Sequence, residues 1–233
     1  MIKDKFYKKI KRFRSKYRDK LNDDILHYID INILPNYLKN DNAHNLEHIY
    51  YVLKKSFHIA NSIKEEIDYN IVYLLASSHD AEYHIDYATH EEIVANKFLN
   101  NPFWEKYFSQ DTRNLIYKSL KFHDTKIDRQ KLDIYSQILR TADCEVDINV
   151  LLNRMYNFRL YYFNQMTINE IIDDSYNYLI ILFGEDGLNI NKNCFYDKSF
   201  ERIKQKSKNL IKNKNKFKKV FAKVNKIKLS YWL

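Results

Sequence analysis

Glycine and proline are nearly absent from this chain, and that scarcity constrains its fold more than any other feature of the sequence. Each occurs only twice among 233 residues. Strand-rich folds need many tight turns, and tight turns depend on these two residue types. Their scarcity therefore predicts long helices joined by polar loops. Because 45% of the residues are hydrophobic, the chain can bury one sizeable core.

Hydrophobic residues recur at helical spacing along most of the chain. The basic N-terminal segment 1–20 carries an apolar stripe on one side of a helix. Segment 68–80 is apolar nearly all round, which predicts a central helix. Further helices are expected over 23–34, 44–63, 90–99, 111–123, 129–143, 149–163 and 167–183, and the Lys-rich segment 200–221 keeps helical spacing. We therefore expect one all-α domain over residues 1–233.

Capping residues mark some of these helix boundaries. Asp111 is expected as the N-cap of the helix that ends at His123. Thr167 and Glu170 have the spacing of a capping box, and Gly184 is expected to end the helix that this box begins.

Cysteine usage and hydropathy exclude several classes of protein. Cys144 and Cys194 lie 50 residues apart and no C-x-x-C pair occurs, so neither a thiolate zinc site nor a disulfide framework is expected. This suits a reducing compartment. The N-terminus has no apolar secretory core, and no uninterrupted apolar run reaches transmembrane length. We expect a soluble, cytoplasmic protein.

Charge is distributed unevenly along the chain, whose formal net charge is +9. Residues 1–20 carry +8 and residues 197–233 carry +11, whereas residues 21–196 carry −10. An acidic body suits a cation site, and basic ends suit phosphates or acidic surfaces. Two alternatives stay open for the ends: amphipathic helices packed on the domain, or contact with nucleic acid or another anionic surface.

Histidines and aspartates gather at the ends of the expected helices. The set comprises His48, His79, Asp80, His90, His123 and Asp143. His79 and Asp80 close an apolar segment, where a carboxylate without a partner is costly to bury. Imidazole and carboxylate together suit Mn, Fe, Co, Ni or Zn, and Mg less well. Such an ion makes hydroxide available at neutral pH and neutralises phosphoryl charge, which points to hydrolysis by metal-bound water.

The order of four of these residues resembles the HD-domain superfamily of metal-dependent phosphohydrolases. His48 comes first, then the dipeptide His79-Asp80, then Asp143. The local contexts are similar as well: AHNLEHIYYVL around the first histidine, YLLASSHD at the dipeptide and SQILRTAD at the last aspartate. The resemblance covers about residues 40–150. It implies that these four residues hold a divalent metal ion.

The resemblance also implies an architecture and a second ion. The fold would be an HD-type helical bundle, with the basic helix 1–20 and a C-terminal helical extension 150–233 added to it. Some members of the superfamily bind a second metal through two further histidines, and His90 and His123 are the matching positions. The alternatives are an exposed His90, a structural His123, or contact of both with substrate phosphate alone.

Other side chains are candidates for substrate chemistry. Several HD enzymes use an acidic residue just after the dipeptide, which makes Glu82 a candidate general base; the alternative is an ordinary loop acid. Asp80 joins it as a catalytic candidate. His44, Arg140 and Lys121 are candidates for substrate binding, and Arg140 could grip a phosphate bidentately. Their alternatives are ordinary structural or surface contacts.

Three functions stay open. The first is metal-dependent hydrolysis of a nucleotide or a related phosphate ester or anhydride, with one or two ions. The second is cleavage of a phosphodiester in nucleic acid or a cyclic dinucleotide, which the basic ends favour. The third is a non-catalytic HD fold used for binding, against which the full set of ligands speaks.

Overall fold

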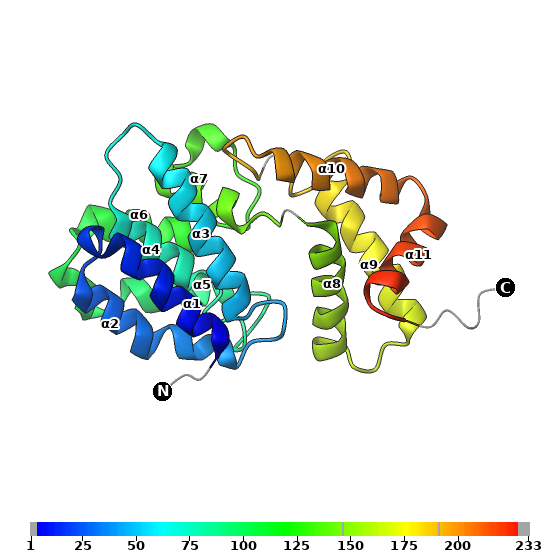
Figure 1. The fold of residues 1–233 in the computed structure, drawn as a ribbon, viewed down its shortest axis with the longest axis horizontal. Helices are drawn as coiled ribbons and strands as arrows, with labels where there is room; N and C mark the ends of the chain where they lie inside the picture. The colour runs from blue at the N-terminus through cyan, green and yellow to red at the C-terminus, as the bar shows by residue number, and fades with distance from the viewer. Residues whose placement is uncertain (1–3, 146, 191, 228–233) are drawn as a thin grey trace. The chain divides into compact units, whose positions relative to one another are not determined.

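The computed structural model describes residues 4–145, 147–190 and 192–227, and these residues form helices and loops without any β-strand (Figure 1). The prediction of an all-α chain is confirmed for them. The α-helices are α1 (Lys5–Arg14), α2 (Asp23–Asn32), α3 (Leu46–Ser62), α4 (Tyr69–Ser78), α5 (His90–Leu99), α6 (Gln110–Lys121), α7 (Ile134–Asp143), α8 (Ile148–Tyr162), α9 (Ile168–Phe183), α10 (Lys198–Ile211) and α11 (Lys214–Val224). Short 3-10 helices are η1 (Ser15–Lys20), η2 (Leu34–Leu38), η3 (Pro102–Lys106) and η4 (Arg129–Lys131).

The chain forms two compact units. The first comprises Met1–Asn40 and His44–Asp143, and the second comprises Asp41–Ala43 and Cys144–Leu233. Helices α1 to α7 therefore belong to the first unit, and α8 to α11 to the second. The sequence has no Gly/Ser-rich linker at this boundary, and the single domain over 1–233 stays a prediction.

The core of the first unit is built around α4. This helix packs against α3 and α7, while α5 packs against α6. Every residue of α4 from Ile71 to Ser78 is buried, as expected for a helix that is apolar nearly all round. Its polar end, where His79 and Asp80 follow, therefore lies inside the unit, and both side chains are buried too.

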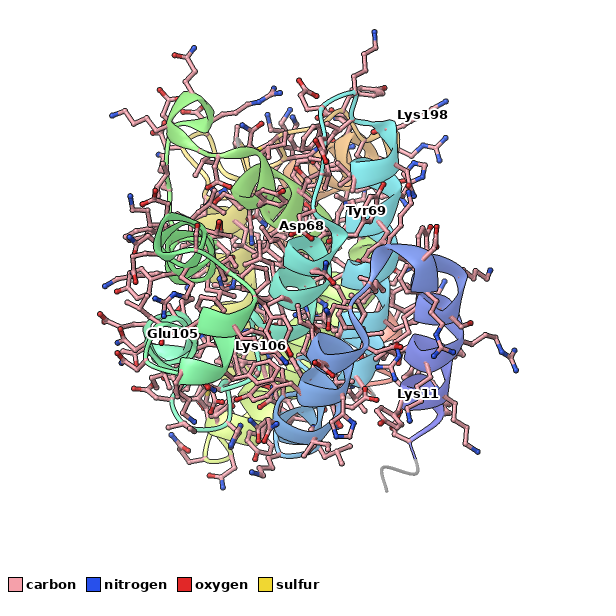
Figure 2. All side chains as sticks on the ribbon, turned by 90° about the vertical axis from the view of Figure 1, so that its left-hand side faces the viewer. Lys11, Asp68, Tyr69, Glu105, Lys106 and Lys198 are labelled. Carbon is pink, nitrogen blue, oxygen red and sulfur yellow. The ribbon has the colours of Figure 1, made fainter. Side chains whose placement is uncertain are left out.

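The basic N-terminal helix α1 is packed against the first unit through its apolar stripe. Phe6 and Ile10 are buried, and α1 contacts α3. Arg14, the last residue of α1, donates two hydrogen bonds of 2.6 and 2.7 Å to the carboxylate of Asp30 on α2. The nitrogen of Lys11, labelled in Figure 2, lies 3.7 Å from the same carboxylate. Part of the charge of this segment is thus neutralised within the fold.

The predicted helix boundaries are confirmed at α9 but not at α6. Thr167 and Glu170 form the capping box of α9, which ends at its C-cap Gly184. The prediction that Asp111 caps α6 is wrong: the Ser109 side chain accepts a 3.2 Å hydrogen bond from the backbone of Thr112, and the helix begins at Gln110. The serine, two residues earlier, accepts a hydrogen bond from a free backbone amide at the start of the helix, and Asp111 lies in the first turn instead.

The second unit gathers four helices around its own hydrophobic core. Buried members of this core include Leu152 of α8, Leu179 of α9, Phe200 of α10, and Phe217 and Phe221 of α11. The Lys-rich segment is not one helix, because α10 ends at Ile211 and Asn213 caps α11. Among the residues that the structure describes, no helix combines the length and the apolar character needed to cross a bilayer.

Candidate metal centre

Consecutive helices of the first unit place the predicted histidines and aspartates at or near their ends. His48 lies in the first turn of α3, His79 and Asp80 follow α4, His90 begins α5, His123 follows α6, and Asp143 ends α7. Although these positions span nearly 100 residues of sequence, the structure brings all six side chains into one buried cluster.

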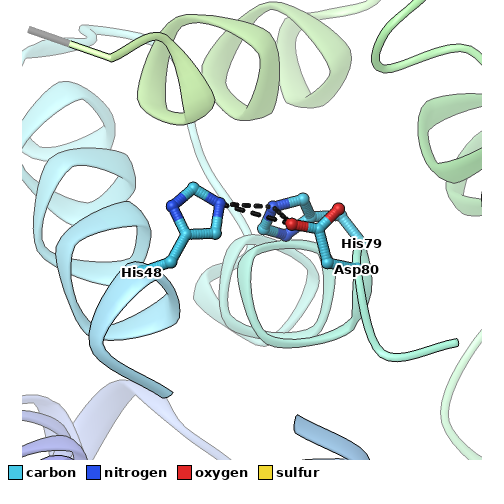
Figure 3. A group of neighbouring side chains, drawn as sticks. All are labelled: His48, His79 and Asp80. Atoms are coloured by element: carbon cyan, nitrogen blue, oxygen red, sulfur yellow. Dashed lines mark hydrogen bonds and ion pairs between the residues drawn. The ribbon is translucent and has the colours of Figure 1, made fainter. Parts of the chain in front are cut away.

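The first half of the cluster combines His48, His79, Asp80 and Asp143. The Nε2 atoms of His48 and His79 are 3.3 Å apart and lie 3.4 and 3.3 Å from Oδ2 of Asp80 (Figure 3). Oδ1 of Asp143 lies 3.2 and 3.5 Å from the same two nitrogens. His48, His79 and Asp80 thus form a group that could hold a metal ion.

The second half of the cluster uses the other oxygen of Asp80. Oδ1 lies 3.3 Å from Nε2 of His90 and 3.9 Å from Nε2 of His123. Asp80, His90 and His123 form a second group that could hold a metal ion. Asp80 is therefore shared, with one oxygen facing each pair of histidines.

Three of the histidine rings are oriented by their own backbone. Nδ1 of His79, His90 and His123 lies 3.2, 3.1 and 2.7 Å from the carbonyl oxygen three residues earlier in the chain. A carbonyl can only accept, so Nδ1 donates and the neutral ring carries its lone pair on Nε2. Bonds of this kind fix the tautomer of metal-binding histidines. All three rings therefore present Nε2, the atom that faces Asp80.

Electrostatics inside the cluster favour a charged carboxylate. Burial alone would raise the pKa of Asp80, but the surrounding histidines hold it well below its usual range. Burial alone would lower the pKa of His79, but the Asp80 and Asp143 carboxylates raise it to about 10. The pKa of His90 is likewise raised by Asp80 against the effect of burial, whereas burial lowers the pKa of His123. Asp80 is thus ionised at neutral pH.

Two buried nitrogens in this cluster have no hydrogen-bond partner. They are Nε2 of His90 and Nε2 of His123, in side chains that are 4% and 1% exposed. A buried polar atom without a partner costs about 1–3 kcal/mol. A cation seated between these nitrogens and Oδ1 of Asp80 would satisfy both, so the residues present fit a metal ion.

Asp80 is held in place by two side chains that the sequence did not point to. Its backbone amide donates a 3.2 Å hydrogen bond to the hydroxyl of Tyr37, which is buried. Its carbonyl accepts a 2.8 Å bond from the amide of Asn40, which also donates 2.9 Å to the carbonyl of His44. Both partners come from more than 35 residues upstream, and no local pattern indicates them.

Glu82 is buried, and both of its carboxylate oxygens have donors. Asn36 donates to Oε1 at 3.2 Å, and Lys97 of α5 donates to Oε2 at 2.7 Å. Asn36 and Lys97 are not members of the His/Asp cluster, although Glu82 itself lies two positions after Asp80. Its role as a general base stays a prediction.

The substrate-binding candidates His44 and Lys121 occupy different environments. The ring of His44 stacks on that of Tyr83, with centroids 3.6 Å apart and planes at 18°. The ammonium of Lys121 lies 2.7 Å from the carboxylate of Glu92 on α5. His44 is half-buried and precedes His48 by four residues, whereas Lys121 precedes His123 by two.

The guanidinium of Arg140 is hydrogen-bonded to backbone carbonyls at and beside His123. It is only 2% exposed, and its Nη1 donates to the carbonyl oxygens of Phe122, His123 and Thr125 at 2.8, 3.0 and 2.6 Å. These carbonyls belong to the end of α6 and the turn after it, where a cation is favourable. Arg140 therefore ties α7 to the segment that carries His123. Phosphate binding by Arg140 stays a prediction.

Replacing Arg140 by methionine is expected to lower the free energy of unfolding of the metal-free protein by about 3 kcal/mol, since charge-assisted bonds to buried carbonyls are lost. Arg140→Lys should lose less, because an ammonium still donates. Chemical denaturation measures both. Arg129→Met, at an exposed position of η4, is the control. Equal stability of the Arg140→Met and Arg129→Met proteins would show that the carbonyl bonds contribute nothing.

Asp124 is a cluster neighbour that the sequence analysis missed. Its carboxylate joins His123 and Asp143 in a third group whose ligand atoms all lie within 4.8 Å of one another. Unlike the other members, Asp124 is exposed. The signal that could have found it is the dipeptide His123-Asp124, which repeats the His-Asp pair of positions 79 and 80 at another helix end.

Comparison with protein-family models, with curated proteins and with solved structures finds no significant match for this chain. The described residues of the chain are all-helical apart from loops, and they hold a buried cluster of histidine and aspartate side chains that could bind a metal ion.

Proposed function

We propose that this chain is a metal-dependent phosphohydrolase of the HD-domain type. One observation carries the proposal: the two oxygens of Asp80 face different pairs of histidines, Oδ2 toward His48 and His79, and Oδ1 toward His90 and His123. A carboxylate so placed suits two cations side by side. Nε2 of His90 and Nε2 of His123 are also buried without a hydrogen-bond partner, which a bound cation would supply.

In this proposal each residue has a defined task. His48, His79 and Asp143 hold a first divalent ion, His90 and His123 hold a second, and Asp80 holds both. Bound ions of this kind supply a nucleophilic water at neutral pH and neutralise charge on a phosphoryl group. The two carboxylates offset the charge of the ions. Since imidazole nitrogens outnumber carboxylates, Mn, Fe, Co, Ni or Zn suits the cluster better than Mg.

The substrate class that suits this arrangement is a nucleotide or related compound with a phosphate ester or anhydride. Two bound ions would supply charge stabilisation for both the attacking and the leaving oxygen, which would help most with phosphodiesters and polyphosphate anhydrides. A single ion would favour monophosphates. Cleavage of a nucleic acid or a cyclic dinucleotide is the second candidate, and the same division of the Asp80 oxygens favours it.

A substrate screen tests the proposed hydrolysis. The full chain, loaded with Mn²⁺, Co²⁺ or Mg²⁺, is assayed against nucleoside monophosphates, nucleoside polyphosphates, dinucleoside polyphosphates, cyclic dinucleotides and short oligonucleotides. We expect turnover of at least one class that is lost on chelation and restored by metal. Metal binding without turnover of any class would instead favour the non-catalytic alternative.

Replacing Glu82 by glutamine is expected to lower kcat by about 10²–10⁴-fold with unchanged metal content, if its carboxylate accepts a proton during the reaction. The structure offers a matched control in Lys97→Met, which removes the ion pair but keeps the carboxylate. Steady-state kinetics and elemental analysis measure both variants. A Glu82→Gln protein with parental kcat would show that Glu82 is not the general base and serves only in the contacts with Asn36 and Lys97.

A further inference from the structure

The outward face of α11, in the second unit, is made of lysines. Acidic residues end at Glu201, and the described segment 202–227 contains 11 Lys and Arg residues. On α11 itself Lys216, Lys219 and Lys223 are exposed. Their spacing of three and four residues places them on one side of the helix. The His/Asp cluster of the first unit makes no use of this face.

The apolar residues of α11 all turn the other way. Phe217, Phe221 and Ala222 are buried in the core of the second unit. The lysine face therefore has no exposed apolar side chain on its own helix. A helix that lies in a membrane interface inserts such an apolar face into the lipid, so α11 lacks the feature that insertion into a membrane interface requires.

The fold itself does not neutralise the lysine face. Asp173 of α9 pairs with Lys214 at 3.2 Å and with Lys218 at 3.1 Å, so these two lysines of α11 share one carboxylate. Within the described part of the chain, no ion pair involves Lys216, Lys219 or Lys223. Three adjacent cations without counter-charge remain available to a partner that supplies the negative charge.

We propose that the face formed by Lys216, Lys219 and Lys223 binds the phosphate backbone of a nucleic acid. From the first to the third lysine the helix rises about 10 Å. One strand of a duplex carries a phosphate about every 3.4 Å along its axis, so the face matches about three phosphates. Point charges on flexible stems suit such sequence-independent contact. This binding needs neither metal nor hydrolysis, so a test of it is independent of the proposed function.

The test measures binding of the full chain, in the presence of chelator, to a fluorescently labelled 20-nucleotide single strand and to its duplex over a salt series. The variant Lys216→Gln/Lys219→Gln/Lys223→Gln should bind at least about tenfold more weakly at 0.1 M salt. For this variant the slope of log Kd against log salt concentration should be smaller by about 2–3, as expected for three lost phosphate contacts. The triple Lys→Arg variant keeps the charge and should keep the affinity, which separates charge from folding.

A charge-matched control is Lys8→Gln/Lys64→Gln/Lys131→Gln, at three exposed positions of the first unit. We expect it to bind like the parent protein. Equal weakening in both glutamine triples would reduce the effect to net charge and overturn the proposal. Binding to phosphatidylserine vesicles without binding to either oligonucleotide would overturn it in favour of a membrane surface.

Discussion

Asp80→Ala is expected to lose both metal ions and to hydrolyse substrate at least about 10³-fold more slowly, a loss of about 4 kcal/mol in transition-state stabilisation. The reason is that Asp80 faces all four histidines of the cluster, two with each oxygen. Elemental analysis of the purified protein measures the metal, and steady-state kinetics measure the rate. Asp80→Asn, which keeps the shape of the side chain, should behave in the same way.

The fold should survive this substitution. Asp80 is one of two carboxylates that raise the pKa of His79, and the other, Asp143, stays 3.5 Å from Nε2 of that ring in the variant, so His79 is not left buried without a partner. Asp86→Ala, in the exposed loop that follows, is the control and should keep metal and activity. An Asp80→Ala protein with parental metal content would refute the assignment of the cluster as a metal site.

His90→Ala and His123→Ala are each expected to lower the metal content from two equivalents to one. Both rings face Oδ1 of Asp80, whereas the first group, on Oδ2, remains intact in either variant. Hydrolysis of phosphodiesters and anhydrides should fall far more than any residual hydrolysis of monophosphates, which need less help with the leaving group. Titration with Mn²⁺ followed by elemental analysis counts the ions.

His58→Ala is the matched control for this pair, because His58 is an exposed histidine of α3. It should retain two equivalents. One equivalent in the parent protein, unchanged in both cluster variants at saturating Mn²⁺, would reject the second ion. It would leave His90 and His123 as contacts for substrate phosphate and favour hydrolysis of nucleoside monophosphates.

Local sequence was enough to predict most of the helices and the position of the cluster residues on them, although not the start of α6 or the break between α10 and α11. Segment 68–80, apolar nearly all round, predicted a central helix, and the polar pair at its end predicted a partner; the structure places His48 and Asp143 there. The capping box of α9 was predictable because it depends on four consecutive residues. Features set by short-range geometry were thus accessible from the sequence.

Features set by tertiary contacts were not accessible. Tyr37 and Asn40 hold the backbone of Asp80 across 43 and 40 residues of sequence. The hydrogen bonds of Arg140 to backbone carbonyls depend on where the chain turns after α6, and its predicted role as a phosphate ligand stays a prediction. The division into two compact units likewise depends on contacts between helices, since no Gly/Ser-rich linker marks the boundary.

The backbone hydrogen bonds that orient His79, His90 and His123 have a consequence for how this chain can vary. Each acceptor is a main-chain carbonyl three residues away, so replacing a neighbouring side chain does not delete it. The orientation of each ring therefore depends on the backbone conformation at the helix end and not on which side chains surround it. A chain can diverge until nothing resembles it as a whole and still keep its imidazoles aimed at one carboxylate.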